Sequence, residues 1–153
     1  MLSSKLIAMV EDHWESIATR VFQRFRQDPE LFHLRKMPES DLRDWGREIA
    51  KNLGHWLTAS ESVVAQRYEQ IGRTRYQQLV PLHECVHALH IVKNALLSFV
   101  RDQGIGQTTV EVFAEEELEH HVGLFFDCVI LHLVRGYEDE MRLALHHTAA
   151  AGR

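Results

Sequence analysis

The sequence predicts an all-α protein, an up-and-down helical bundle of four to five helices with a long C-terminal helix. Three observations lead to this fold class. Apolar residues recur with a 3.6-residue period along most of the chain, helix breakers are few (3 prolines and 8 glycines), and the alternation typical of β-strands is hard to find. The 153 residues suffice for one domain with a full hydrophobic core.

Two helices are expected in the first third of the chain. The first begins with Ser3 or Ser4 as N-cap and ends at the Asp28-Pro29 pair. Its apolar face consists of Leu6, Val10, Trp14, Ile17, Val21 and Phe25. The second begins near Ser40, after a loop. Its apolar face consists of Leu42, Trp45, Ile49, Leu53, Trp56 and Leu57.

Two more helices are expected in the middle. One spans about 61–78, with Val64, Tyr68, Ile71 and Leu79 on its inner side. The next takes Pro81 as its first residue and ends at Gly104. Its inner face consists of Leu82, Cys85, Val86, Leu89, Val92, Leu96, Phe99 and Val100.

The last helix is expected after a GIGQT turn, capped by Thr108 or Thr109, and runs to about His147. Its acidic opening suits the positive end of a helix dipole. Some 35 residues make a helix of roughly 50 Å, longer than a small bundle needs, so we expect its end to serve as a connecting or pairing helix. The domain is thus predicted to span 1–147, with 148–153 as a frayed tail.

Composition narrows the class of function. The formal net charge is −5 and arginines are scattered among acids, so a nucleic-acid partner is not expected. The apolar stretch at the N-terminus is too short and too acidic for the hydrophobic region of a signal peptide. No apolar run approaches the roughly 18 residues that cross a bilayer. Two cysteines without a CxxC motif fit buried thiols in a reducing compartment. We therefore expect a cytoplasmic protein without a membrane partner.

Histidines form the most prominent motif, because the chain holds 11 of them. His83, Glu84 and His87 match the H-E-x-x-H pattern of zinc proteases, and His90 continues the same helix face. The E-x-x-H pairs also resemble the dimetal sites of helical bundles, although helical phase turns the histidines away from the apolar face. A stripe of histidines that faces solvent or a second subunit is the simpler interpretation. No cofactor is expected, with a metal such as Zn or Fe as the alternative.

Polar residues that face inward are the other candidates. Arg75 shares the phase of Tyr68 on the third helix, and Glu115 shares the phase of the apolar residues of the last helix. Arg75 and Glu115 could pair with each other, or Arg75 could hold an anionic ligand. Nucleophilic triads and glycine-rich phosphate loops are absent from the sequence, so an enzyme is less favoured than a binding protein.

Two segments carry a family resemblance: DPELFHLRKMPESDLRDW and YEQIGRTRYQQLVPLHECVHALHIVKNALLSFVRDQGI. Within them, Gly72, Arg73 and Arg75 lead to Pro81 and the PLHE run. Over most of residues 10 to 140 the chain resembles the N-terminal sensory domain of RsbR/RsbRD-type regulators and of some sensor histidine kinases.

The resemblance implies a helical, usually dimeric domain that receives a signal and passes it through its C-terminal helix to an output domain. The predicted function is therefore a sensory or regulatory domain in bacterial signal transduction. It would act as a homodimer with a signalling partner or output domain, and would use Tyr68, Arg75 and Glu115 to bind a ligand. Two alternatives remain. One is a metal-binding bundle or metalloenzyme that uses His83, Glu84, His87 and His90, and the other is a protein-protein interaction module.

Overall fold

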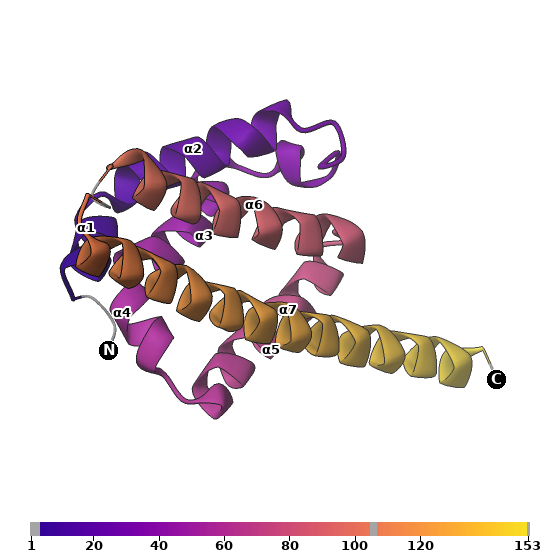
Figure 1. Ribbon diagram of the computed structural model, residues 1–153. Helices are drawn as coiled ribbons and strands as arrows, with labels where there is room; N and C mark the ends of the chain where they lie inside the picture. Colours follow the sequence, from indigo (N-terminus) through magenta and orange to yellow (C-terminus); the bar gives the residue numbers. More distant parts are fainter. Residues whose placement is uncertain (1–3, 105–106, 153) are drawn as a thin grey trace.

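The computed structural model describes residues 4–104 and 107–152, which form seven α-helices, one 3-10 turn and no strand (Figure 1). The all-α class and the long last helix are confirmed. The elements are α1 (Ser4–Asp12), α2 (Trp14–Gln27), η1 (Leu34–Lys36), α3 (Glu39–Lys51), α4 (Leu53–Thr58), α5 (Glu61–Gln77), α6 (Leu82–Asp102) and α7 (Thr109–Ala151). The predicted cap Ser3, the turn residues Ile105 and Gly106, and the final Arg153 lie outside the described residues.

The first two predicted helices are each broken, which corrects the expected boundaries. The chain leaves helical geometry at His13 (φ −110°, ψ 24°) and at Asn52 (φ −119°, ψ 29°). Apolar residues on both sides of each break still face one core, so the periodicity alone does not reveal the interruption. Ser4 lies inside α1 instead of capping it. The breaks let the short α1 pack against both α3 and α4.

The core is a single cluster to which every α-helix contributes. α2 packs against α3 and α6, and α7 lies across α5 (Figure 1). An aromatic group occupies the contact of α4, α5 and α7: the ring of Tyr68 lies 5.7 Å from that of Trp56 and 6.2 Å from that of Phe125. None of the helices within the described ranges combines the length and apolar character that a membrane span requires.

Two glycines allow α5 and α7 to approach each other unusually closely. Gly72 and Gly136 are both buried in the contact between these helices. A β-carbon at Gly72 would lie 2.8 Å from the backbone nitrogen of Tyr137, and one at Gly136 would lie 2.6 Å from the Cα of Glu69. The two backbones are therefore in direct contact, and no side chain separates them.

Helix α7 begins as predicted and ends later than predicted. The Thr108 hydroxyl accepts a hydrogen bond from the Glu111 backbone N–H at 3.2 Å, which confirms the N-cap. The helix then runs for 43 residues to Ala151, past the expected end near His147. Its last part extends away from the other helices (Figure 1), and residues 145–151 are all exposed.

The connection between α5 and α6 is a tight turn in which Leu79 adopts a left-handed conformation, with φ 62°. The Leu79 N–H donates to the Tyr76 carbonyl at 2.9 Å, and the Val80 N–H donates to the Arg75 carbonyl at 3.1 Å. This pair of bonds defines a Schellman motif, in which glycine is the usual left-handed residue. Leu79 was predicted on the inner face of the helix, but 79% of it is exposed. Pro81 precedes α6 instead of being its first residue.

We predict that Leu79→Gly stabilises the protein. The left-handed conformation costs a side chain-bearing residue about 1–2 kcal/mol, and the greater backbone entropy of glycine in the unfolded chain offsets part of the gain. The expected net increase in the free energy of unfolding is about 0.5–1 kcal/mol. Urea denaturation followed by circular dichroism measures it. Leu79→Ala is the control, because it removes the exposed side chain but keeps the strain; an equal gain there would contradict this explanation.

Candidate functional site

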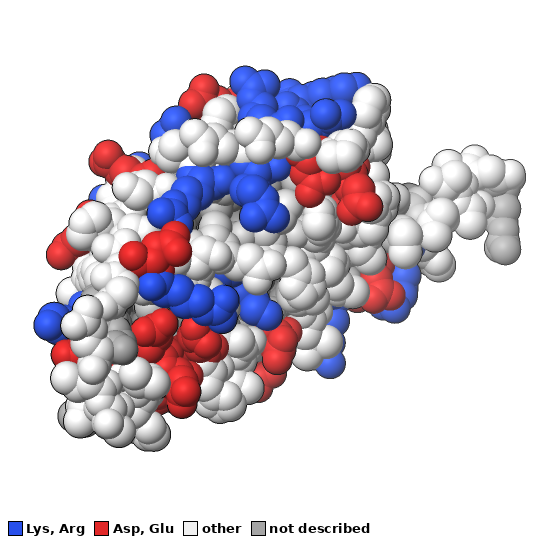
Figure 2. Space-filling view, turned by 45° about the horizontal axis from the view of Figure 1, so that its top comes forward, with Lys and Arg blue, Asp and Glu red and all other residues white. Residues whose placement is uncertain are grey.

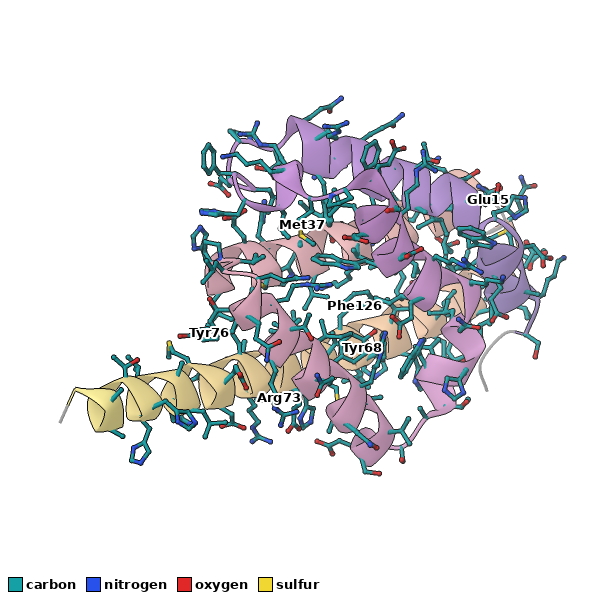
Figure 3. The ribbon with its side chains drawn as sticks, turned by 180° about the vertical axis from the view of Figure 1, so that it is seen from behind. Glu15, Met37, Tyr68, Arg73, Tyr76 and Phe126 are labelled. Carbon is teal, nitrogen blue, oxygen red and sulfur yellow. The ribbon has the colours of Figure 1, made fainter. Side chains whose placement is uncertain are left out.

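A cavity of about 360 Å³ lies between α3, α5 and α6, with one wall on α7. Its size falls in the range of small-molecule pockets in proteins. Met37 and Tyr68, labelled in Figure 3, both line it. The lining residues are Met37, Asp41, Asp44, Trp45, Glu48, Ile49, Arg67, Tyr68, Gln70, Ile71, Thr74, Arg75, Gln78, Cys85, Ala88, Leu89, Val92 and Leu133.

Arg75 is a buried cation in the wall of this cavity, with 8% of its surface exposed. Its guanidinium carbon lies 3.6 Å from the ring centre of Trp45, so the charge is stacked on an indole face. The guanidinium donates one hydrogen bond, of 2.9 Å, to the side-chain oxygen of Gln78. Burial lowers the pKa of Arg75 to about 10, which still leaves it charged at neutral pH. Among the described residues no carboxylate forms an ion pair with it.

Tyr68 is a buried phenol in the same cavity, two helical turns before Arg75 on the same side of α5. Burial raises the pKa of the Tyr68 phenol far above its usual range, so the hydroxyl keeps its proton. Within the described parts of the chain no hydrogen bond engages this hydroxyl. A buried phenol usually finds a partner, so this donor is available to a ligand.

The mouth of the cavity carries charges of both signs. Arg67 donates two hydrogen bonds of 2.7 Å to the two carboxylate oxygens of Glu48, so these two opposite charges neutralise each other. Asp41 and Asp44 are exposed on α3 at the same opening. The unpaired cation among the described lining residues therefore lies inside the cavity, at Arg75, while the acidic groups lie at its rim.

Glu115, the third predicted ligand-binding residue, does not line this cavity. It lies 18 residues before Leu133 on α7, which corresponds to about 27 Å along the helix axis. Its charge acts on Arg101 at the end of α6. Tyr68 and Arg75 thus line one cavity, whereas Glu115 lies far away along α7. The ion pair between Arg75 and Glu115 that the sequence allowed does not form.

The four residues of the predicted metal alternative are not brought together either. His83 and His90 are exposed, and His87 is half-buried. The His87 Nε2 lies 2.7 Å from a carboxylate oxygen of Asp28 and 3.7 Å from one of Glu30, and the contact with Asp28 lowers the pKa of that carboxyl. The histidine stripe therefore faces solvent and the α2–η1 loop.

Glu84 has a structural contact that the sequence did not indicate. It is buried, and its carboxylate accepts hydrogen bonds from the backbone N–H groups of His33 and Leu34 at 2.9 and 3.2 Å. The second carboxylate oxygen lies 2.5 Å from the His33 Nδ1. Glu84 thus fixes the loop before η1 to the start of α6, instead of serving as the base of a metal site.

His132 is the second residue that sequence reasoning missed. It is buried on α7, and its two ring nitrogens face carboxylates of Glu61 and Glu69 on α5. In the sequence it only interrupts an apolar run. Its partners lie 63 and 71 residues away, so no local pattern could have revealed them.

Charged groups form bands of both signs on the face that Figure 2 shows. Figure 2 shows lysine and arginine gathered along the upper edge and across the middle of one face, with acidic groups beside each band. Several basic side chains also lie over aromatic rings, such as Arg26 and Arg43 over Phe22. The absence of a nucleic-acid partner stays a prediction.

Comparison with known proteins identifies the family. The family model described as the RsbT co-antagonist protein rsbRD N-terminal domain matches residues 15–151, most of the chain. No curated protein and no solved structure matches the chain. The match covers the α5–α6 connection, the cavity and all of α7, and it confirms the resemblance inferred from the sequence. The chain belongs to the family of RsbT co-antagonist protein rsbRD N-terminal domains.

Proposed function

We propose that this domain is the signal-receiving part of a stress-signalling regulator, and that its signal is a small molecule with an apolar body and one anionic group. One observation carries the proposal: two buried side chains line one cavity with donors left over among the described residues. The Arg75 guanidinium has one hydrogen bond, to Gln78, and no carboxylate partner, and the Tyr68 hydroxyl has no hydrogen bond. The membership of the family supports a regulatory role.

The lining of the cavity supports this class of ligand. A carboxylate accepts two parallel hydrogen bonds from a guanidinium, and the pairing is strengthened where water is excluded. The Tyr68 hydroxyl, two turns away along α5, can donate a bond to a polar atom elsewhere in the ligand. Ile49, Leu89 and Val92 provide apolar contact for the remainder of the molecule.

The position of the cavity supports transmission through α7. The ring of Tyr68 meets that of Phe125 on α7 in a T-shaped contact, and the next turn of α5 holds Gly72 against the α7 backbone. A ligand that shifts α5 would therefore shift its contact with α7 directly, because the two backbones touch.

We further propose that the domain acts in the cytoplasm as a homodimer and contacts a signalling partner or output domain. Support for pairing comes from α7, where the large apolar side chains of Leu124, Leu131 and Leu145 are exposed. Their spacings of 7 and 14 residues place them on one side of the helix. Sedimentation of the tag-free protein tests the homodimer, and a monomer at all concentrations would contradict it.

We predict that Arg75→Met weakens the binding of small carboxylates by about tenfold to a hundredfold, because a charge-assisted hydrogen bond contributes about 1.5–3 kcal/mol. Benzoate, phenylacetate and octanoate, each compared with the matching alcohol, are suitable probes. Their binding is measured by thermal shift and by the fluorescence of Trp45, which stacks on Arg75. Tyr68→Phe should lose less, since it removes one neutral donor.

The matched control is Arg73→Met. Arg73 lies on the outer side of α5 (Figure 3) and does not line the cavity, so this variant should bind the probes as the unaltered protein does. Equal binding by the Arg75 and Arg73 variants, or no preference for carboxylates over alcohols, would contradict the proposed ligand class.

A further inference from the structure

We infer that Glu61, Cys128 and His132 form a binding site for a transition-metal cation of the Zn²⁺ class, with Glu69 orienting the histidine. The site lies outside the ligand cavity, and the inference does not depend on the proposed function. One ligand atom from each of the three residues lies within 4.8 Å of the others. Cys128 and His132 are four residues apart on α7, which places both on one helix face toward α5.

The surroundings of His132 carry the argument. Its Nδ1 lies 2.9 Å from a carboxylate oxygen of Glu69, and its Nε2 lies 3.3 Å from a carboxylate oxygen of Glu61. A neutral imidazole has one N–H, so a bond from Nδ1 to Glu69 leaves the Nε2 lone pair facing another acceptor. A cation between Nε2 and the Glu61 carboxylate satisfies both groups.

Glu69 is placed to orient the His132 ring without binding the cation itself. Histidines that bind metals commonly donate the other ring N–H to a carboxylate, which fixes the tautomer and the direction of the ring. Only 6% of the His132 side chain is exposed, so its ring has little freedom apart from this contact. The arrangement leaves Nε2 directed at Glu61.

The donor set indicates the kind of cation. A thiolate, an imidazole and a carboxylate are typical zinc ligands, whereas Mg²⁺ and Ca²⁺ prefer oxygen alone. Glu61 is 74% exposed in the first turn of α5, so its side chain can move to shorten the distances on binding. A fourth position would be open to water. The bound cation would join the start of α5 to the middle of α7.

The test is a titration of tag-free, chelator-treated protein with ZnCl2 in competition with a chromophoric chelator. We expect one tightly bound Zn²⁺ per chain. Cys128→Ser and His132→Gln should abolish this binding, and Glu69→Gln should weaken it about tenfold to a hundredfold. His87→Gln is the matched control, because His87 lies in the separate group with Asp28 and Glu30 and should leave the affinity unchanged.

Two further measurements report on the Cys128 thiol directly, and the first of them needs no variant. Zn²⁺ should protect Cys128 of the unaltered protein from alkylation, while the buried Cys85 serves as an internal reference that reacts slowly with or without metal. Co²⁺ should give a thiolate charge-transfer band that Cys128→Ser lacks. Binding that persists in Cys128→Ser, or no protection of Cys128, would overturn the site and leave His132 as a bridge between the carboxylates of Glu69 and Glu61.

Discussion

Replacing Gly72 or Gly136 by alanine is expected to lower the free energy of unfolding by about 3 kcal/mol or more, the upper range for overpacking. A β-carbon at either position would meet backbone atoms of the facing helix: Tyr137 N at 2.8 Å for Gly72, and Glu69 Cα at 2.6 Å for Gly136. Backbone cannot rotate away as a flexible side chain can. The helices must therefore separate, which also opens the aromatic contact between Tyr68 and Phe125.

Gly123→Ala is the matched control for this prediction. Gly123 lies in α7, as Gly136 does, and a β-carbon there meets nothing within 4 Å. Alanine at that position should stabilise the protein by about 0.5–1 kcal/mol, because glycine is a poor helix former. Urea denaturation followed by circular dichroism measures all three variants. If Gly72→Ala and Gly136→Ala had the same effect as Gly123→Ala, the result would contradict the close backbone contact between α5 and α7.

Glu84→Leu is expected to cost about 3 kcal/mol, the second of the two largest effects. Leucine is similar in size but cannot accept the hydrogen bonds from the backbone N–H groups of His33 and Leu34. An unsatisfied buried donor costs about 1–3 kcal/mol, and Leu34 is fully buried. The loop before η1 should therefore detach from α6, which faster amide hydrogen exchange at His33 and Leu34 would detect.

Glu84→Gln distinguishes the hydrogen bonds from the charge. The glutamine oxygen can take the place of the carboxylate oxygen that accepts both backbone N–H groups. This variant should lose clearly less stability than Glu84→Leu and keep the slow exchange of both amides. Equal losses for the two variants would indicate that the negative charge, and not the backbone contact, makes Glu84 important.

The sequence predicts the helical segments better than their interruptions. Thr108 is a capping residue and Gly104 a terminating one, because each has a local preference that acts within one turn. The breaks at His13 and Asn52 have no comparable signal, since apolar residues continue in phase across them. Leu79 was misplaced for the opposite reason, because a residue just past a helix end no longer follows its period.

Helical geometry explains why the sequence predicts only part of the candidate site. Helical phase identifies the side on which a residue lies, and it placed Tyr68 and Arg75 correctly toward the interior. Phase does not show at which level two neighbouring helices cross. It therefore could not show that Glu115, on the long α7, lies far from Arg75 on α5. Glu84 and His132 depend on partners at least 50 residues away, and such contacts appear only in the folded chain.

The length of α7 has a consequence for register. Because an α-helix turns by about 100° for each residue, the direction that its projecting end presents depends on the number of residues between that end and the crossing at Gly136. One inserted residue would rotate an attached segment by about 100°, whereas seven would return it to within about 20° of its original direction. The phase of this helix, as well as its reach, would therefore determine which face it presents to the partner or output domain that we propose.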